Sequence, residues 1–328
     1  MEYQKLLDTV DILGYAGICT STEFSQLLKN SLLILQKENH FRKCYYWGKI
    51  NGIQKDYHIA FGYEKDCMNG QIYYYSMDGL NWLLLPKSQK YAKFLTPLAV
   101  NKFEGEPSFA TNVYDSNPPF PPNEDPKHYY NEPIPKELKE EDRLATIVET
   151  IREDAAIIPR GGWFKCSNGD IVENVAFEGL DLPDASNLKS YLHARPPQQK
   201  WNTNLLSRPD YNYATDFLDT IDLDVPHGCW NLQLILEARL IILHSLYWPG
   251  MTFYHKLSTP HYGFLYVGNG KKNMDLPFMV ANNSTNQNAR LRVDKMDRLK
   301  STPEDGSTVT AEGRTSFESQ YTTDTQAQ

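Results

Sequence analysis

Apolar residues recur at helical spacing in three parts of the chain. Leu6, Val10 and Leu13 predict an N-terminal helix that ends at Gly14. Ser21 and Thr22 are both suitable N-caps for a second helix up to about residue 39. The third helix, predicted over 136–154, carries apolar residues on one face and charged residues on the other, as helices packed against a core do.

Elsewhere apolar and aromatic residues alternate or cluster in short runs, which predicts strands. Four strands are expected in the first third of the chain and more in the middle and toward the end, over 44–50, 56–61, 71–77, 81–85, 157–165 and 228–267. Tight turns are expected at the glycines of Asn51-Gly52, Asp78-Gly79 and Asn168-Gly169. A helix is the alternative for 232–246, and short helices are expected over 183–191 and 214–221.

These elements predict an α+β fold with antiparallel β-sheets and with N-terminal and central amphipathic helices. We expect one domain over 1–280, interrupted by an acidic, proline-rich loop at about 104–135. Residues 281–328 are rich in Thr, Ser, Gln and Glu, and contain one Phe and one Tyr. Such a composition does not bury enough apolar surface to offset the entropy of ordering, so the sequence predicts a disordered polar tail.

The proline-rich loop is the most acidic part of the chain. It holds eight prolines, and 104–142 contains ten acidic residues against three lysines. Proline disfavours both helix and central strand, so the loop is expected at the surface, where it is a candidate surface for a partner protein. The candidate residues are Glu104, Glu106, Asp115, Phe120, Glu124, Asp125 and Glu132. A polyproline ligand for an SH3-like domain, in an adaptor protein, is the alternative interpretation.

Charge and composition exclude several classes of protein. The net charge of −8 argues against unaided binding to nucleic acid or to an anionic membrane. No apolar run approaches the length of about 18 residues that a membrane span needs. The N-terminus has no secretory pattern, so we expect a protein of the cytoplasm or nucleus, with its five scattered cysteines as free thiols.

The chain carries no recognisable catalytic or cofactor motif. Gly270-Lys271 matches only the end of a phosphate-binding loop, because Leu265 stands where the first glycine is required and Lys272 where a hydroxyl is required. His255 and His261 are expected to flank a hairpin loop as packing residues, and His58 to lie on the polar face of a strand. We expect no cofactor and no metal site. An enzyme with an unrecognised pair of carboxylates or histidines is the alternative.

Six glycines are expected to make structural turns: Gly48, Gly52, Gly161, Gly250, Gly263 and Gly268. If Gly48 or Gly250 has positive φ, its replacement by valine is expected to destabilise the fold by about 1–3 kcal/mol.

Several blocks of uncommon residues occur in an order that resembles the radial spoke head protein 9 family of ciliary and flagellar axonemes. They are YWGKI at 46–50, DYHIA at 56–60, AIIPRG at 156–161, FEGL at 177–180, WPGMTFYH at 248–255 and NMDLPFM at 273–279. The resemblance runs from about residue 5 to 280. The loop over 118–131 and the tail depart from the family pattern.

The resemblance implies a non-enzymatic structural subunit of the radial spoke head, which helps pass signals from the central pair of microtubules to the dynein arms. It implies an axonemal location, on the cytoplasmic side and within the cytoskeleton. The implied partners are head proteins 4, 6 and 1, with transient contacts to central-pair projections, and neither nucleic acid nor membrane.

Overall fold

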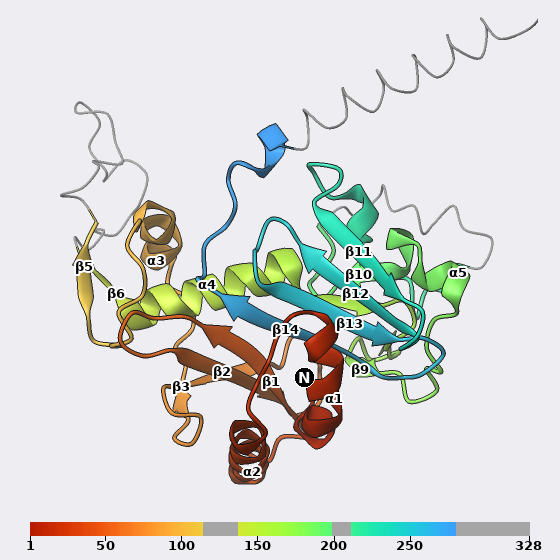
Figure 1. Ribbon diagram of the computed structural model, residues 1–328, viewed down its shortest axis with the longest axis horizontal. Helices are drawn as coiled ribbons and strands as arrows, with labels where there is room; N and C mark the ends of the chain where they lie inside the picture. The colour runs from red at the N-terminus through yellow and green to blue at the C-terminus, as the bar shows by residue number, and fades with distance from the viewer. Residues whose placement is uncertain (114–136, 199–210, 280–328) are drawn as a thin grey trace, which may run out of the picture. The chain divides into compact units, whose positions relative to one another are not determined.

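An eight-stranded sheet runs through the described part of the protein (Figure 1). The computed structural model describes residues 1–113, 137–198 and 211–279, all within the unit Met1–Val280. The predicted tail, and all but the first ten residues of the predicted proline-rich loop, lie outside the described residues.

The strands of the large sheet follow the order β11-β12-β13-β14-β1-β2-β3-β4. Their bounds are Lys43–Ile50 (β1), Tyr57–Tyr63 (β2), Ile72–Ser76 (β3), Leu83–Leu84 (β4), Trp230–Ile235 (β11), Leu240–Ser245 (β12), Met251–Lys256 (β13) and Tyr262–Gly268 (β14). Three two-stranded sheets pair β5 (Ala110–Asn112) with β6 (Glu137–Lys139), β7 (Ile157–Pro159) with β10 (Tyr191–His193), and β8 (Trp163–Lys165) with β9 (Ile171–Glu173).

The long helices form where the sequence has helical periodicity and suitable ends. They are α1 (Leu6–Tyr15), α2 (Thr22–Glu38) and α4 (Glu140–Ala155), and shorter helices occur at α3 (Lys90–Leu95) and α5 (Leu182–Ala185). The Ser21 side chain caps α2 by accepting the Phe24 N–H at 3.2 Å. Three acidic residues open α4 and Arg152 lies in its last turn, which suits the helix dipole.

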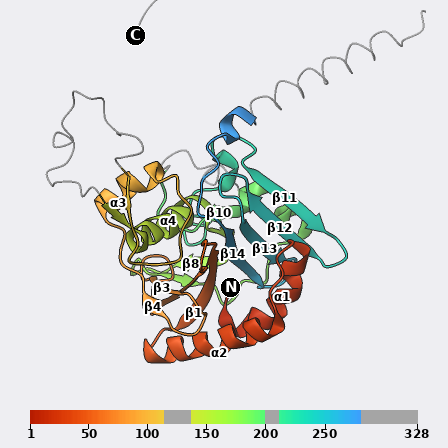
Figure 2. The same cartoon turned by 60° about the vertical axis from the view of Figure 1, so that its left-hand side comes forward.

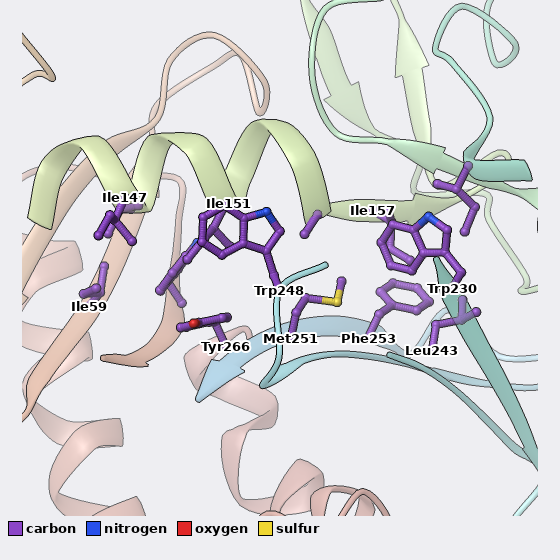
Figure 3. Packing of buried hydrophobic residues seen from close by; sticks show 14 of the residues in the cluster. Ile59, Ile147, Ile151, Ile157, Trp230, Leu243, Trp248, Met251, Phe253 and Tyr266 are labelled. Carbon is purple, nitrogen blue, oxygen red and sulfur yellow. The ribbon is translucent and has the colours of Figure 1, made fainter. Parts of the chain in front are cut away.

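Helices cover both faces of the large sheet (Figures 1 and 2). On one face Leu28, Leu32 and Leu35 of α2 pack with α1 and the sheet. On the other face Ile147 and Ile151 of α4 join a larger aromatic cluster (Figure 3). Neighbouring strand residues therefore enter two different cores, as alternation along a strand requires.

The first four strands form an antiparallel group, as predicted, and the last four form a second antiparallel group; the α+β class is confirmed. The two groups join through β1 and β14, which run parallel, with Gly48 opposite Tyr266. The sequence did not indicate this parallel pair. It makes one continuous sheet from segments more than 200 residues apart in the sequence.

Four local predictions were wrong. Asn51-Gly52 makes no two-residue turn, since β1 and β2 are linked by residues 51–56. The helix expected over 183–191 ends at Ala185 apart from a short 3₁₀ turn, because Tyr191 pairs with Pro159 in a strand. No α-helix forms over 214–221, because a turn ends at Thr215, Thr220 bridges to Leu192 and a 3₁₀ turn begins at Ile221.

His58 is the fourth wrong prediction, because the sheet has no bare polar face there. Its ring packs against Phe24 of α2, with centroids 4.8 Å apart, and its Nδ1 lies 2.9 Å from the Tyr46 hydroxyl. Among the described residues, no helix is both long and apolar enough to span a membrane.

Candidate functional site

The predicted acidic surface is described only at its start. Glu106 is exposed and Glu104 is half-buried, just after the buried Phe103. The other five candidates, Asp115, Phe120, Glu124, Asp125 and Glu132, lie outside the described residues.

A buried carboxylate anchors this start to the central helix. Glu140, 3% exposed at the first position of α4, accepts the backbone N–H groups of Glu104 and Gly105 at 2.8 Å and of Glu106 at 3.2 Å. The Tyr57 hydroxyl donates to the same carboxylate at 2.6 Å, and burial followed by this bond raises the Tyr57 pKa. The carboxylate thus ties the acidic segment to α4 and to the sheet.

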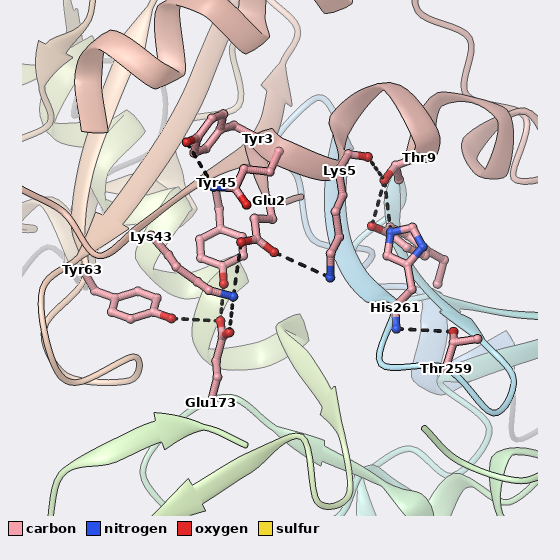
Figure 4. Close-up of polar contacts among 12 residues, drawn as sticks. Glu2, Tyr3, Lys5, Thr9, Lys43, Tyr45, Tyr63, Glu173, Thr259 and His261 are labelled. Atoms are coloured by element: carbon pink, nitrogen blue, oxygen red, sulfur yellow. Dashed lines mark hydrogen bonds and ion pairs between the residues drawn. The ribbon is translucent and has the colours of Figure 1, made fainter. Parts of the chain in front are cut away.

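A second carboxylate, Glu173, collects donors where β9 meets β1 and β2 (Figure 4). The hydroxyls of Tyr45 and Tyr63 donate to one of its oxygens, and the Lys43 ammonium to the other. Burial opposes the charge of Lys43, but the bond and the charge of Glu173 outweigh it, so the Lys43 pKa is raised. A cavity of about 130 Å³ lies beside this group.

The Glu173 group is satisfied within the chain. Both carboxylate oxygens have donors, and burial, followed by the charge of Glu173, raises the pKa values of Tyr45 and Tyr63. A tyrosine that holds its proton this firmly is a hydrogen-bond donor and not a base. The arrangement therefore fastens the β8–β9 hairpin to the large sheet. No sequence pattern marks Glu173 or Glu140, because their partners are distant in the chain.

His255 and His261 bracket the β13–β14 hairpin, as predicted, and each has a packing role. His255 is fully buried, and its Nε2 accepts the Leu180 N–H at 3.0 Å, so burial lowers its pKa to about 4. His261 lies on the other side of the hairpin, with Nε2 3.4 Å from the Thr9 hydroxyl (Figure 4). The two rings do not converge on one site.

The remaining candidate metal-binding and catalytic side chains also lie apart from one another. Over residues 1–113, 137–198 and 211–279, no three His, Cys, Asp or Glu side chains come together in a way that could hold a metal ion. All five cysteines are free thiols. His244 and Ser245 are neighbours on β12 and bond different groups, Thr252 and the Trp248 N–H respectively.

The six glycines fall into two groups. Gly48, Gly161 and Gly250 have positive φ, at 145°, 83° and 100°. A Cβ on Gly48 or Gly250 would lie 2.0 Å from a carbonyl oxygen of β14, that of Tyr266 or Val267. The remaining three have no positive φ, but a Cβ there would lie within 3 Å of a neighbouring atom: Gly52, Gly263 and Gly268.

Comparison with known proteins identifies the family. No family model matches the chain. Curated proteins named radial spoke head protein 9 homolog, from Bos taurus and Homo sapiens, are each 36% identical to it over 280 residues, which cover 85% of this chain and 100% of the relative. The homolog from Danio rerio is 35% identical over 281 residues, with the same coverage. The chain belongs to the radial spoke head protein 9 family. The family resemblance drawn from the sequence blocks is thereby confirmed.

The alignment with these radial spoke head protein 9 homologs covers their whole length and 85% of this chain. The large sheet contains three of the blocks that carried the resemblance. YWGKI lies in β1, DYHIA overlaps β2, and WPGMTFYH leads into β13. The glycines that face β14 at close range, Gly48 and Gly250, lie inside two of these blocks.

Proposed function

We propose that this protein is a non-enzymatic structural subunit of the radial spoke head in motile cilia and flagella. It resides in the axoneme, on the cytoplasmic side and within the cytoskeleton. The observation that carries the proposal is the end-to-end similarity to curated radial spoke head protein 9 homologs at 36% identity.

In this role the protein helps transmit signals from the central pair to the dynein arms and so controls motility. Its partners are the head proteins 4, 6 and 1, and it touches central-pair projections transiently; it binds neither nucleic acid nor membrane. The acidic segment supports transient contact, because charges of one sign change how fast a partner associates more than how tightly it binds. Glu140 supports it further, since it fixes the start of that segment to a rigid helix.

Buried and half-buried polar groups also support a structural role. Glu140, Glu173 and His255 each bond groups of the protein's own chain, and these bonds join elements that are distant in the sequence. An active site needs titratable groups that converge on a place open to a substrate. In the described part of the chain, Glu140, Glu173 and His255 form hydrogen bonds that hold elements of the fold together.

The proposal is tested in ciliated cells whose own copy of the gene is deleted and replaced by a tagged one. We expect the tagged protein in isolated axonemes and, after salt extraction, in a complex with other spoke subunits. The deletion is expected to impair beating and the tagged copy to restore it. Recovery of the tagged protein only in the soluble fraction, with metabolic enzymes, would overturn the proposal.

A further inference from the structure

Among the strands that the structure describes, the large sheet ends at β11, which pairs with β12 alone (Figures 1 and 2). In an antiparallel pair, every second residue directs its backbone groups to the partner strand. The Leu246 N–H donates to the Cys229 carbonyl, so Asn231 and Gln233, two and four residues further on, also face β12. Leu232 and Leu234 therefore direct their N–H and C=O groups outward.

These outward groups have no hydrogen-bond partner within the described ranges of the chain. An edge of this kind is a template for another strand, and proteins usually block it with a charge, a proline, a bulge or a very short strand. β11 has none of these features: its six residues, WNLQLI, are uncharged and free of proline, and its register with β12 is unbroken. The opposite edge, β4, has only two residues.

The β11 edge is held in place from within the fold. The Trp230 indole N–H donates to Asp224 at 2.7 Å, and Trp230 is 8% exposed. Leu232 and Leu234 pack partly against the core on the same face. On the opposite face, Asn231 and Gln233 are exposed and uncharged. The free groups thus lie on a strand fixed by its own side chains.

We propose that β11 is a docking edge that takes an extended segment of a neighbouring spoke subunit as a ninth strand. Only an extended main chain offers donors and acceptors at the repeat of two residues, about 7 Å, that the outward groups require. The segment is largely uncharged, with apolar side chains on the face of Leu232 and Leu234 and polar ones on the face of Asn231 and Gln233. This inference rests on the proposed function.

The test compares variants in the deletion cells described above. Asn231→Lys combined with Gln233→Lys places charge on the edge while leaving the bonds to β12 intact. Gln26→Lys combined with Asn30→Lys adds the same charge at exposed positions of α2, as a matched control. We expect both purified proteins to keep the wild-type melting temperature, and the edge variant to be at least tenfold depleted from axonemes while the control is incorporated normally.

A second measurement needs no substitution. Amide hydrogen exchange is followed at Leu232 and Leu234 in the free protein and in the extracted spoke complex. Both amides are expected to gain at least tenfold protection in the complex, while Asn231 and Gln233, already bonded to β12, change much less. This readout decides the matter if the edge variant does not fold.

The outcomes separate the two proposals. Normal incorporation of a folded edge variant, or unchanged exchange at Leu232 and Leu234, overturns the docking edge and leaves the proposed function standing. Absence of the wild-type protein from axonemes overturns the proposed function. A purified wild-type dimer that the edge lysines convert to a monomer makes a second copy the occupant, and overturns pairing with a different subunit.

Discussion

Gly48 and Gly250 approach the backbone of β14 from its two sides. Gly48 lies in β1 and Gly250 directly precedes β13, the two strands that pair with β14. Each has positive φ, and each would place a Cβ 2.0 Å from a carbonyl oxygen, at the consecutive residues Tyr266 and Val267. Gly48 therefore allows the close β1–β14 contact that joins the halves of the sheet, and Gly250 allows the start of β13 to approach β14 closely.

Replacing Gly250 by alanine tests this contact. We expect Gly250→Ala to lower the free energy of unfolding by about 3 kcal/mol, because strain from positive φ adds to overpacking against Val267. Gly169→Ala is the control: Gly169 has φ 92° but no atom within 4 Å of its added Cβ, so only the backbone strain of about 1 kcal/mol remains. Urea unfolding measures both values. Equal losses in the two variants would show that the approach to β14 is not tight.

The chain has two Asn-Gly dipeptides that were both expected to form hairpin turns, and only one of them does. Asn168-Gly169 links β8 and β9 with Gly169 at positive φ, as expected for a hairpin turn. Asn51-Gly52 does not, because the Gly52 N–H donates to Asp56 at 3.1 Å and Gly52 bridges to Phe103. These contacts override the local turn preference, and the one to Phe103 lies outside any local sequence window.

Periodic elements were predictable because their pattern is repeated over many residues. α2 and α4 have long apolar faces, and β11 and β12 were correctly preferred as strands over a helix. The carboxylate groups were not predictable. Tyr57 lies 83 residues from Glu140 and Lys43 lies 130 residues from Glu173, so only the fold brings them together.

Glu140 joins α4 to β2 and to residues 104–106 through hydrogen bonds to its carboxylate. Both of its oxygens accept hydrogen bonds, so in Glu140→Gln the new NH₂ group must face an N–H donor in either orientation. We expect the variant to lose about 2–3 kcal/mol of unfolding free energy, since a buried donor is left unsatisfied. Thermal or urea unfolding measures the loss.

Glu141→Gln is the matched control on the next residue of α4. Glu141 is half-buried and accepts the Tyr75 hydroxyl at 3.0 Å, a bond that an amide oxygen also accepts. We expect a loss below about 1 kcal/mol. If both variants lose the same amount, Glu140 does not anchor the segment.

For the whole molecule, the α+β class, the antiparallel group of the first four strands and the family could be read from the sequence. The joining of the first four strands to the last four through β1 and β14 could not, because each group forms a complete antiparallel pattern by itself. The packing of α2 over β2, which half-buries His58 against Phe24, could not be read from the sequence either. Burial of this histidine is thus a consequence of tertiary packing.

The buried His255 and the half-buried His58 make the stability of the whole fold depend on pH. Burial lowers the pKa of both His255 and His58 from 6.5 to about 4. Between these values the unfolded chain binds protons that the folded chain does not, so unfolding is favoured as pH falls. The stabilisation is complete above pH 6.5 and is lost as pH falls from 6.5 toward 4. At pH 5 the loss is about 2 kcal/mol for the fully buried His255.

Urea unfolding at pH 7.5 and pH 5 measures this dependence. His255→Gln keeps an acceptor for the Leu180 N–H but cannot titrate. We expect the difference in unfolding free energy between the two pH values to be smaller in this variant than in the wild type by about 2 kcal/mol. His40→Gln, at an exposed position, is the control for the loss of an imidazole ring. If His255→Gln leaves the difference unchanged, His255 titrates alike in the folded and unfolded chains, and its burial does not set the pH dependence.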